Sequence, residues 1–274
     1  MLYILLALGF LSASVISALG GLLTATAWYW FILIFLGLWL GSFLGWLIVY
    51  VLFLLIVSVL VDKKKEVTKP SRFYGYFVKE TMSLLLFFSR SKVHMTGVEQ
   101  IPTDTKYLLV ANHLSNFDPI TCLTQFGKND LIFVSKPENF NLPIAGSWIY
   151  RAGFMAIDRE SPKNALVTIN KAADYLKNQV VSVGIFPEGT RNKSGEGLLE
   201  FKNGAFKIAT KAKVPIVVAT LKNTRQVQKN FPWKRTHIYM DVEVISKEEV
   251  MESNTAQLSD RVYKIMMDNL EKRK

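Results

Sequence analysis

The first 61 residues contain no Asp, Glu, Lys, Arg or His, and this run constrains the fold more than any other feature of the chain. A membrane-spanning helix needs about 20 apolar residues, because the hydrocarbon core is about 30 Å thick. One continuous helix of this run would be about 92 Å long. The run must therefore turn back, and we expect helices over residues 2–23 and 30–61 that form a membrane hairpin. We place the turn at 24–27, ahead of the Trp-Tyr-Trp sequence at 28–30, because such rings prefer the headgroup level.

Basic residues follow the apolar run directly, at Lys63, Lys64 and Lys65. The positive-inside rule places this end of the hairpin in the cytosol, so we expect a protein of the cell membrane whose remainder lies on the cytoplasmic side. A hairpin that never crosses the bilayer stays open as an alternative. The net charge of +11 suits an anionic membrane, an acidic partner or nucleic acid. Cys122 is the one cysteine and excludes a disulfide scaffold.

The chain divides into three parts by composition. Residues 1–61 form the hairpin, residues 62–70 a short basic linker, and residues 71–274 one globular domain large enough for a core. Residues 71–90 predict an amphipathic helix, which either lies on the membrane surface or packs into the core. Gly37, Gly41 and Gly45 recur every four residues in the second apolar segment. Either they form a face where helices can approach closely, or they are merely tolerated in the helix.

Strand-like and helical patterns alternate after residue 92. Alternation at this spacing predicts an α/β domain with a mostly parallel sheet flanked by helices. The expected strands are 93–96, 107–111, 131–135, 154–157, 181–186, 215–221 and 237–244. The expected helices are 119–126, 143–151, 162–177, 201–212 and 254–272.

A polar segment, Asn-His-Leu-Ser-Asn-Phe-Asp-Pro at 112–119, follows the apolar strand that ends near residue 111. The carboxyl end of a buried strand is where α/β folds place ligands. Pro119 suits the first position of a helix and Asp118 its N-cap, which makes 113–117 a turn that can fold the ring of His113 onto the carboxylate of Asp118. A carboxylate on one ring nitrogen fixes the tautomer, so that the other nitrogen can take a proton. The alternative is that Asp118 only caps its helix.

A second polar segment, Gly-Ile-Phe-Pro-Glu-Gly-Thr-Arg at 184–191, follows another apolar strand. Its glycines and Thr190 can present backbone N–H and hydroxyl donors, and Arg191 offers a bidentate fork for phosphate. Two further cations, Lys136 and Arg159, sit near predicted strand ends. Thr190 stands where a nucleotide-binding P-loop has its lysine, which excludes that class of site.

Several other classes of site are excluded by what the sequence lacks. A G-x-S-x-G nucleophile elbow is absent, so a serine hydrolase of that type is excluded. The surroundings of His113 offer too few His or Cys residues for a metal site, and we expect none. His94 and His237 fall inside strand-like runs, so we expect both to be structural or surface residues. Nucleic-acid binding is disfavoured because no arginine-rich tract with interleaved aromatic residues occurs.

Taken together, these segments resemble the glycerophospholipid acyltransferase family. Asn-His-Leu-Ser-Asn-Phe-Asp at 112–118 resembles the first family motif, Gly-Phe-Met-Ala-Ile-Asp-Arg at 153–159 the second, Phe-Pro-Glu-Gly-Thr-Arg at 186–191 the third, and Val-Pro-Ile-Val-Val-Ala at 214–219 the fourth. Their order and spacing also match, and the resemblance covers about residues 70–245. Ala156 departs from the second motif, where a bulky residue is frequent, and this leaves the acyl-chain or acceptor preference open.

The resemblance implies an activity and a role for each residue. His113 would take the proton from the free sn-2 hydroxyl of lysophosphatidate, and Asp118 would orient His113. The glycerol-phosphate end would be held by Glu188, Gly189, Thr190 and Arg191, with help from Arg159 and Lys136. The acyl group would come from a coenzyme A or acyl-carrier-protein thioester as co-substrate, with no bound cofactor, and the product would be phosphatidate. The expected partners are membrane lipid and an acidic carrier protein.

Three other functions remain open from the residues themselves. A membrane-anchored thioesterase or lipid hydrolase could use the same His–Asp pair with water as the acceptor. An acyltransferase could act on a different lysolipid. A non-catalytic lipid-binding protein would leave His113 idle.

Overall fold

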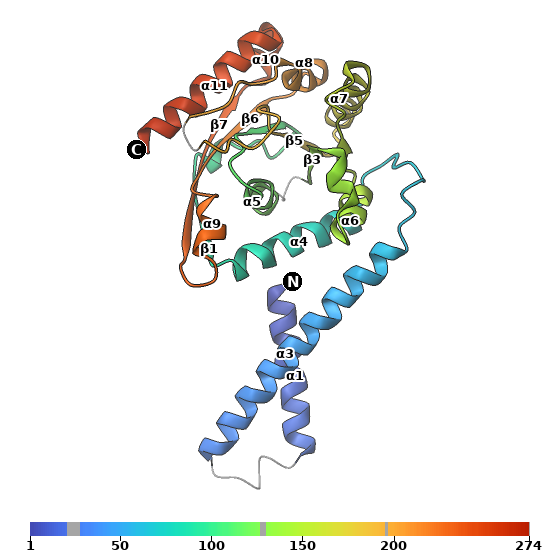
Figure 1. Cartoon of the computed structure of the whole chain (residues 1–274), viewed down its shortest axis with the longest axis vertical. Helices are drawn as coiled ribbons and strands as arrows, with labels where there is room; N and C mark the ends of the chain where they lie inside the picture. The colour runs from blue at the N-terminus through green and yellow to red at the C-terminus, as the bar shows by residue number, and fades with distance from the viewer. Residues whose placement is uncertain (21–27, 127–129, 195–196, 274) are drawn as a thin grey trace. The chain divides into compact units, whose positions relative to one another are not determined.

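The computed structural model describes residues 1–20, 28–126, 130–194 and 197–273. The chain forms two compact units, Met1–Lys64 and Lys65–Lys274, and each is described by itself. The turn expected at 24–27 lies outside the described residues. The first unit is the pair of apolar helices, and the second contains the sheet (Figure 1).

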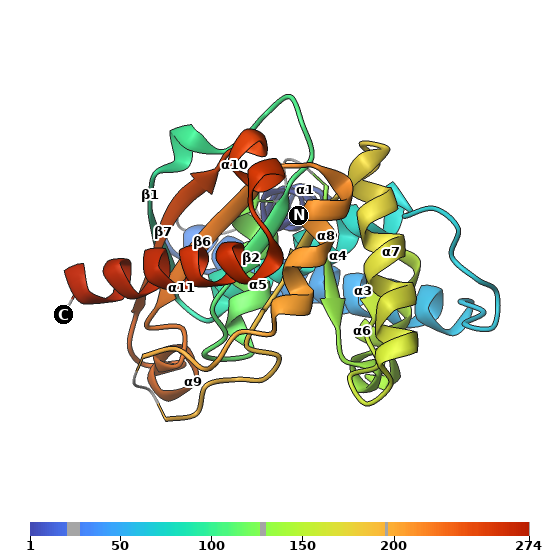
Figure 2. The ribbon, with the colours of Figure 1, turned by 90° about the horizontal axis from the view of Figure 1, so that it is seen from above.

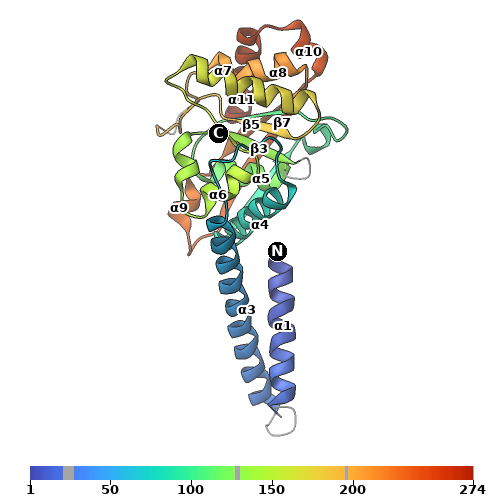
Figure 3. The same ribbon diagram turned by 90° about the vertical axis from the view of Figure 1, so that its right-hand side faces the viewer.

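Two helices make up the first unit, α1 (Leu2–Leu19) and α3 (Trp28–Val59). Both are long and apolar enough to cross a membrane. The two helices pack against each other, as Figures 1 and 3 show. Two indoles fix this packing: Trp39 Nε1 donates to the Leu6 carbonyl at 3.2 Å, and Trp46 Nε1 to the Ser12 hydroxyl at 3.1 Å. Both donors thus find partners within the pair, as polar groups in a lipid environment must.

The close approach of the two helices occurs at Gly9 of α1, where a Cβ would lie 3.1 Å from the Phe43 backbone. One of the two expectations for the glycine stripe of α3 placed the approach there instead. A Cβ at Gly37, Gly41 or Gly45 would meet no atom within 4 Å. The stripe therefore makes no close contact within this pair, and the approach is made at Gly9, where the lack of a side chain lets α1 reach the backbone of α3.

A seven-stranded sheet organises the second unit, in the order β1-β7-β6-β2-β5-β3-β4. Every neighbouring pair is parallel except β6 and β7, which are antiparallel. The mostly parallel sheet predicted from the alternation is confirmed. The strands are β1 (Ser91–Thr96), β2 (Leu108–Ala111), β3 (Leu131–Ser135), β4 (Met155–Ala156), β5 (Ser182–Ile185), β6 (Ile216–Lys222) and β7 (Thr236–Ile245).

The burial of each strand explains its sequence. All residues of β2 and β5 are buried, because helices cover both faces of a parallel sheet and the strand then reads as a continuous apolar run. Strand β7 alternates buried and exposed residues over its first half, as a strand with one solvated face does. Strands β2 and β5 thus read as short apolar runs in the middle of the sheet, and the two polar segments follow their carboxyl ends.

Helices cover the two faces of the sheet in separate groups. Figures 1 and 3 show α7, α8, α10 and α11 on one side and α4, α5 and α6 on the other. Figure 2 shows α11 running along the face of β7, β6 and β2. The bounds of the helices are α4 (Arg72–Phe88), α5 (Phe117–Phe126), α6 (Ala145–Arg151), α7 (Pro162–Lys177), α8 (Lys207–Ala212), α9 (Gln226–Asn230), α10 (Lys247–Glu252) and α11 (Thr255–Lys272). Short 3-10 helices lie at Val98–Gln100, Pro137–Asn141 and Asn203–Phe206.

The largest apolar core lies under the α7–α8–α11 side of the sheet. Leu176 of α7, Ile208 of α8 and Val262 of α11 are fully buried there. The amphipathic α4 packs on the opposite side, where Val78 and Leu84 are buried near α5 and α6. Helix α4 therefore uses part of its apolar surface for the core and leaves another part exposed.

Most of the expected elements match the observed ones within a few residues. The expected strand at 154–157 shrinks to β4 (Met155–Ala156), and the expected helix at 201–212 begins with a 3-10 turn before α8. Helices α9 and α10 were not expected, because each is one to two turns long and too short for a periodic pattern.

Residues 65–70, which the composition groups with the basic linker, belong to the second unit and lie against its helices. Tyr150 donates its hydroxyl to the Lys65 carbonyl at 2.8 Å, and Lys171 Nζ to the Val67 carbonyl at 3.0 Å. Val67 is buried. This segment is therefore fixed along α6 and α7 by the carbonyl groups of its own backbone.

Candidate active site

Three neighbouring strands bring the polar segments together. Strands β6, β2 and β5 are adjacent and parallel, so the loops that follow them meet at one edge of the sheet. Asn112 fixes this edge: its buried side chain donates to the Leu221 carbonyl at 3.0 Å and accepts from the Leu221 N–H at 2.7 Å. The Asn192 N–H donates to the His113 carbonyl at 2.7 Å and joins the loop after β5 to the loop after β2.

The ring of His113 faces the carboxylate of Asp118, with Nδ1 2.8 Å from Oδ2. The same oxygen accepts from the N–H groups of Leu114 and Ser115, both at 2.6 Å. A carboxylate oxygen holding these donors acts as an acceptor, so Nδ1 carries the hydrogen and Nε2 keeps its lone pair. Asp118 is fully buried, whereas the side chain of His113 is 19% exposed and open to a ligand. This arrangement suits a general base.

Asp118 does not cap the helix as expected. Helix α5 begins at Phe117, so Asp118 lies in its first turn, and its carboxylate turns back to the amides of the preceding loop. Its second oxygen accepts from the hydroxyl of Thr224 at 2.5 Å. Thr224 is fully buried and follows β6, 106 residues further along the chain. No pattern along the chain predicted this contact.

A stack of aromatic rings holds the face of His113. The Phe186 ring lies parallel to the His113 ring with centroids 4.2 Å apart, and the Phe133 ring stacks on Phe186 at 5.2 Å. Gly184 of β5 makes room for this stack, since a Cβ there would lie 2.5 Å from the Phe133 ring. We expected Gly184 to offer a backbone donor to a ligand. It is instead a buried strand residue whose missing side chain admits Phe133.

Glu188 is turned inward. Its carboxylate accepts from the His113 N–H at 2.6 Å and from the Leu199 N–H at 3.0 Å, and only 3% of the residue is exposed. Burial raises the pKa of Glu188, and the two backbone hydrogen bonds oppose this shift. We expected Glu188 among the residues that hold a phosphate. The observed contacts bind the loop after β5 to the backbone of His113 instead.

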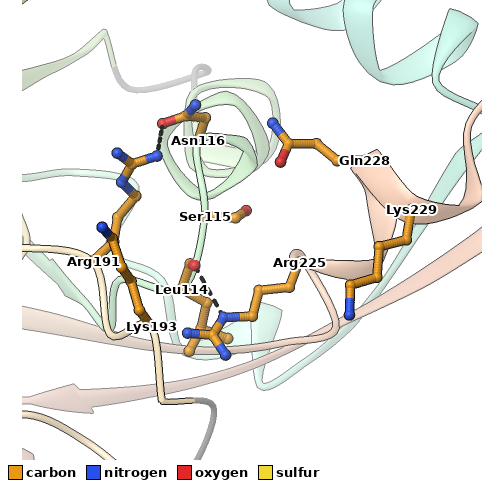
Figure 4. A pocket seen from close by; sticks show the side chains of 8 residues that line it. All are labelled: Leu114, Ser115, Asn116, Arg191, Lys193, Arg225, Gln228 and Lys229. Carbon is orange, nitrogen blue, oxygen red and sulfur yellow. Dashed lines mark hydrogen bonds between the residues drawn. The ribbon is translucent and has the colours of Figure 1, made fainter.

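A cavity of about 350 Å³ opens beside the His113 loop. Figure 4 shows its lining, in which Arg191 lies on one side and donates to the Asn116 side chain at 2.8 Å. Arg225 lies below the loop and donates through Nε to the Leu114 carbonyl at 3.3 Å. The lining residues are Leu114, Ser115, Asn116, Arg191, Lys193, Arg225, Gln228 and Lys229. Four of them are cations and none is acidic, so the cavity suits an anion.

Only Arg191 of these four cations was expected from the sequence. Lys193 lies two residues beyond the recognised segment, and Arg225 and Lys229 belong to the region of α9, which showed no pattern. Among the residues that the structure describes, no Asp or Glu forms an ion pair with any of the four. The lining that the structure describes is therefore cationic and suits an anionic ligand.

The remaining expected residues lie after β3, β4 and β5, on the other side of β2 from α9. Arg159 donates to the carbonyl of Gly189. Gly189 has a φ of +70°, which L side chains rarely adopt, and this turn aims its carbonyl at Arg159. Thr190 and Lys136 are exposed. Among the described residues, no hydrogen bond or ion pair joins Lys136 Nζ to the His113 or Arg191 loops.

Other reactive side chains stand apart from this chemistry. Burial raises the pKa of the Cys122 thiol well above its ordinary value, and the nearby Asp118 charge adds to the shift, so Cys122 is a poor nucleophile. His94 and His237 lie on β1 and β7, with Nε2 of the first 2.8 Å from Nδ1 of the second. Within the described ranges no three His, Cys, Asp or Glu side chains gather in a way that could hold a metal ion.

The fold and the site define an α/β protein in which a His–Asp pair and a cationic cavity lie at the carboxyl edge of a parallel sheet. Residues 92–222, a little under half of the chain, match the family model described as Acyltransferase. The match contains the His113 and Arg191 loops, whereas Thr224 and α9 follow it.

Curated relatives point the same way. The chain is 33% identical over 157 residues to an Arabidopsis thaliana protein named 1-acyl-sn-glycerol-3-phosphate acyltransferase LPAT1, chloroplastic. The matched stretch covers 57% of this chain and 43% of that relative. It is 35% identical over 117 residues to the 1-acyl-sn-glycerol-3-phosphate acyltransferase of Salmonella typhimurium, covering 43% of this chain and 47% of that one. The matched part is thus less than half of the length of either relative.

A solved structure shares the fold. The 1-acyl-sn-glycerophosphate (LPA) acyltransferase PlsC from Thermotoga maritima superposes with a TM-score of 0.62 at 24% identity, over 81% of this chain and 88% of that one. At this identity the likeness supports the fold alone.

Proposed function

We propose that this protein transfers an acyl chain from a thioester to the sn-2 hydroxyl of 1-acyl-sn-glycerol 3-phosphate and forms phosphatidate. The observation that carries the proposal is the His113–Asp118 pair, in which Nδ1 of His113 contacts Asp118 and Nε2 is left for a substrate. The residues that follow His113 in the same loop line the cationic cavity. The matched family and the names of the relatives supply the substrate class. Residues 71–274 would form the acyltransferase domain, and residues 1–61 its membrane hairpin.

The acceptor carries its phosphate close to the reacting hydroxyl, so a base and an anion site must be neighbours. A phosphate monoester has a charge of about −1.5 to −2 at neutral pH. Arg191 offers it a bidentate fork, and Lys193, Arg225 and Lys229 surround the same cavity. Gly189, Thr190, Arg159 and Lys136 stay candidate contacts on the other side of the loop, and Glu188 acts by positioning His113.

The reaction can proceed in one displacement. His113 Nε2 takes the hydroxyl proton as the acceptor oxygen attacks the thioester carbonyl carbon. Asp118 stabilises the imidazolium that forms. When the tetrahedral intermediate collapses, the C–S bond breaks, the new ester remains on the lipid, and the imidazolium returns its proton to the leaving thiolate. The chain itself forms no covalent intermediate, in keeping with the inert Cys122 thiol.

The acyl donor would be a thioester of coenzyme A or of an acyl carrier protein. Both donors carry phosphate, and the carrier protein would be acidic, so the net charge of +11 suits either. The membrane helices keep the enzyme near the acceptor and the product, which both partition into lipid. Lys63, Lys64 and Lys65 favour a cytoplasmic position for the catalytic domain.

The test uses the purified full chain with lysophosphatidate and each thioester in turn, and identifies the lipid formed by mass spectrometry. We expect phosphatidate, and we expect His113→Ala to lower kcat by about 10²–10⁴-fold while lysophosphatidate still binds. Release of thiol at an equal rate without an acceptor would identify a thioesterase instead. Full activity of His113→Ala would refute the assigned base.

A further inference from the structure

An exposed aromatic edge lies where α4 ends and where the α9–β7 loop turns. We define it by Phe87 and Phe88 at the end of α4 and by Phe231 and Trp233 in the loop. Trp233 is 86% exposed, and the other three are 40–56% exposed. Large aromatic side chains rarely stand in water in such a group, and an apolar patch with a polar rim marks a surface that contacts something.

The loop that carries this edge is held firmly. Arg90, two residues after α4, donates through Nη1 to the carbonyls of Pro232 and Trp233, both at 3.2 Å. The Lys234 N–H donates to the Asn230 carbonyl at 2.7 Å, and the Thr236 N–H to the Arg90 carbonyl at 3.2 Å. These bonds join the loop to the end of α4, so the backbone segments that carry the four exposed aromatic residues are held next to one another. A fixed backbone presents their rings outward at little cost in conformational entropy.

The rim of this edge is strongly basic. Residues 222–240 contain no Asp or Glu and five Lys or Arg, and residues 81–98 contain no acidic residue either. Arg90, Lys92, Lys234 and Arg235 are exposed beside the aromatic side chains. Lys229, two residues before Phe231, lines the anion cavity, so the basic rim is continuous with the lining of the site.

We propose that the aromatic edge docks the catalytic domain on an anionic lipid surface, with Trp233 and Phe231 in the headgroup layer. Trp rings with adjacent basic residues are typical of such interfaces, where the ring replaces water and the cations meet anionic lipids. A docking surface for an acidic carrier protein would need the cations but not four protruding aromatic rings, and for this reason the lipid surface fits better.

Docking in this way gives the cavity access to lipid. Under the proposed function, a lysophosphatidate headgroup at the bilayer surface would meet Lys229 and Arg225 before it reaches Arg191. The inference about docking does not depend on that reaction, because lipid contact can be measured without turnover. Failure of docking and failure of the acyltransferase proposal are therefore distinguishable.

The experiment attaches an NBD fluorophore to a cysteine at position 233 in the full chain reconstituted into vesicles. Native Cys122 is fully buried, so labelling is confined to the new thiol of Trp233→Cys. The matched control is Val167→Cys on α7, which is 64% exposed on the opposite side of the sheet. Vesicles of phosphatidylcholine with phosphatidylglycerol are compared with phosphatidylcholine alone, and quenching by doxyl-labelled lipid reports contact.

We expect the label at 233 to shift to shorter wavelength and to be quenched in the anionic vesicles, while the label at 167 does neither. Lys234→Gln with Arg235→Gln in the labelled chain should weaken docking about fivefold per charge. Equal behaviour of the two labels would overturn the proposal. A label at 233 that ignores vesicles and responds to added acyl carrier protein would reassign the surface to that carrier.

Discussion

At the scale of single residues, the catalytic pair depends on a side chain from outside the recognised segments. Asp118 accepts from four donors, and three of them come from its own loop. The fourth is the Thr224 hydroxyl, which holds the other carboxylate oxygen from the side of β6. Thr224 is thus a positioning residue that acts on His113 through Asp118.

Replacing Thr224 tests this positioning. Thr224→Val keeps the shape and removes the donor, and we expect kcat to fall about tenfold with KM for both substrates within twofold, since a hydrogen bond to a charged group is lost. Thr224→Ser keeps the hydroxyl and should restore most of the rate. Steady-state kinetics of both variants test this role. A Val variant with the kcat of the wild type would show that Thr224 contributes to packing only.

The cavity makes a separate prediction for Arg225. Under the proposed function, Arg225→Gln should raise KM for lysophosphatidate about tenfold, because one charge-assisted contact to the phosphate is lost. Lys163→Gln on α7, an exposed residue outside both the cavity lining and the aromatic edge, is the charge-matched control and should leave this KM unchanged. A rise in KM for the thioester alone would assign the cavity to the donor.

At the scale of elements, β5 and β3 support the site through a ring stack. Gly184→Ala would push the buried Phe133 ring, and Phe133 would move Phe186 and then the face of His113. We expect the free energy of unfolding to fall by about 1–3 kcal/mol, as overpacking does, together with a lower kcat. Thermal unfolding in detergent and turnover assays measure both. Gly204→Ala, where a Cβ would meet open space and the backbone has no positive φ, is the control for stability.

The end of α11 is joined to β7 by an ion pair. Arg273 donates to both oxygens of Asp241 at 2.5 Å. Burial tends to raise the pKa of Asp241, but the hydrogen bonds from Arg273 and Thr96 outweigh it and hold this pKa below its ordinary value. A carboxyl with a lowered pKa stabilises the fold above its ordinary pKa of about 3.9, and this contribution is lost as the pH falls further.

We therefore expect Asp241→Asn to lower the free energy of unfolding by about 1–2 kcal/mol at neutral pH. The difference from the wild type should shrink as the pH drops below about 4 and through the pKa of the folded protein. Denaturant unfolding of both proteins across this range measures it. A difference that stays constant with pH would show that the ion pair is not its source.

At the scale of the whole molecule, the second unit contains its own apolar core and every candidate site residue. A chain that starts at Lys65 should therefore fold. Without the two apolar helices it should leave membranes in high salt, because salt screens the remaining electrostatic attraction. The full chain should need detergent. Fractionation of both forms checks this, and a truncated chain that resists salt would mean that the second unit also inserts into lipid.

The sequence predicted much of this molecule because the signals were local. An unbroken apolar run of 61 residues requires membrane helices, and apolar strands followed by polar turns predict an α/β sheet with ligands at strand ends. His113 and Asp118 lie five residues apart, so one turn is enough to pair them. The direction of the Asp118 carboxylate was still missed, because it depends on the backbone path of that turn.

What the tertiary structure alone decided is which distant loops share the edge of the sheet. Strand order sets β6 beside β2, and only this brings Thr224 and Arg225 to a loop more than 100 residues earlier. Packing also turns the Glu188 carboxylate inward and fills the space beside Gly184 with the Phe133 ring. The contact between the two apolar helices likewise lies at Gly9 and not at the α3 glycines. Patterns along a chain record burial and local geometry, whereas contacts between remote segments arise from how whole elements pack.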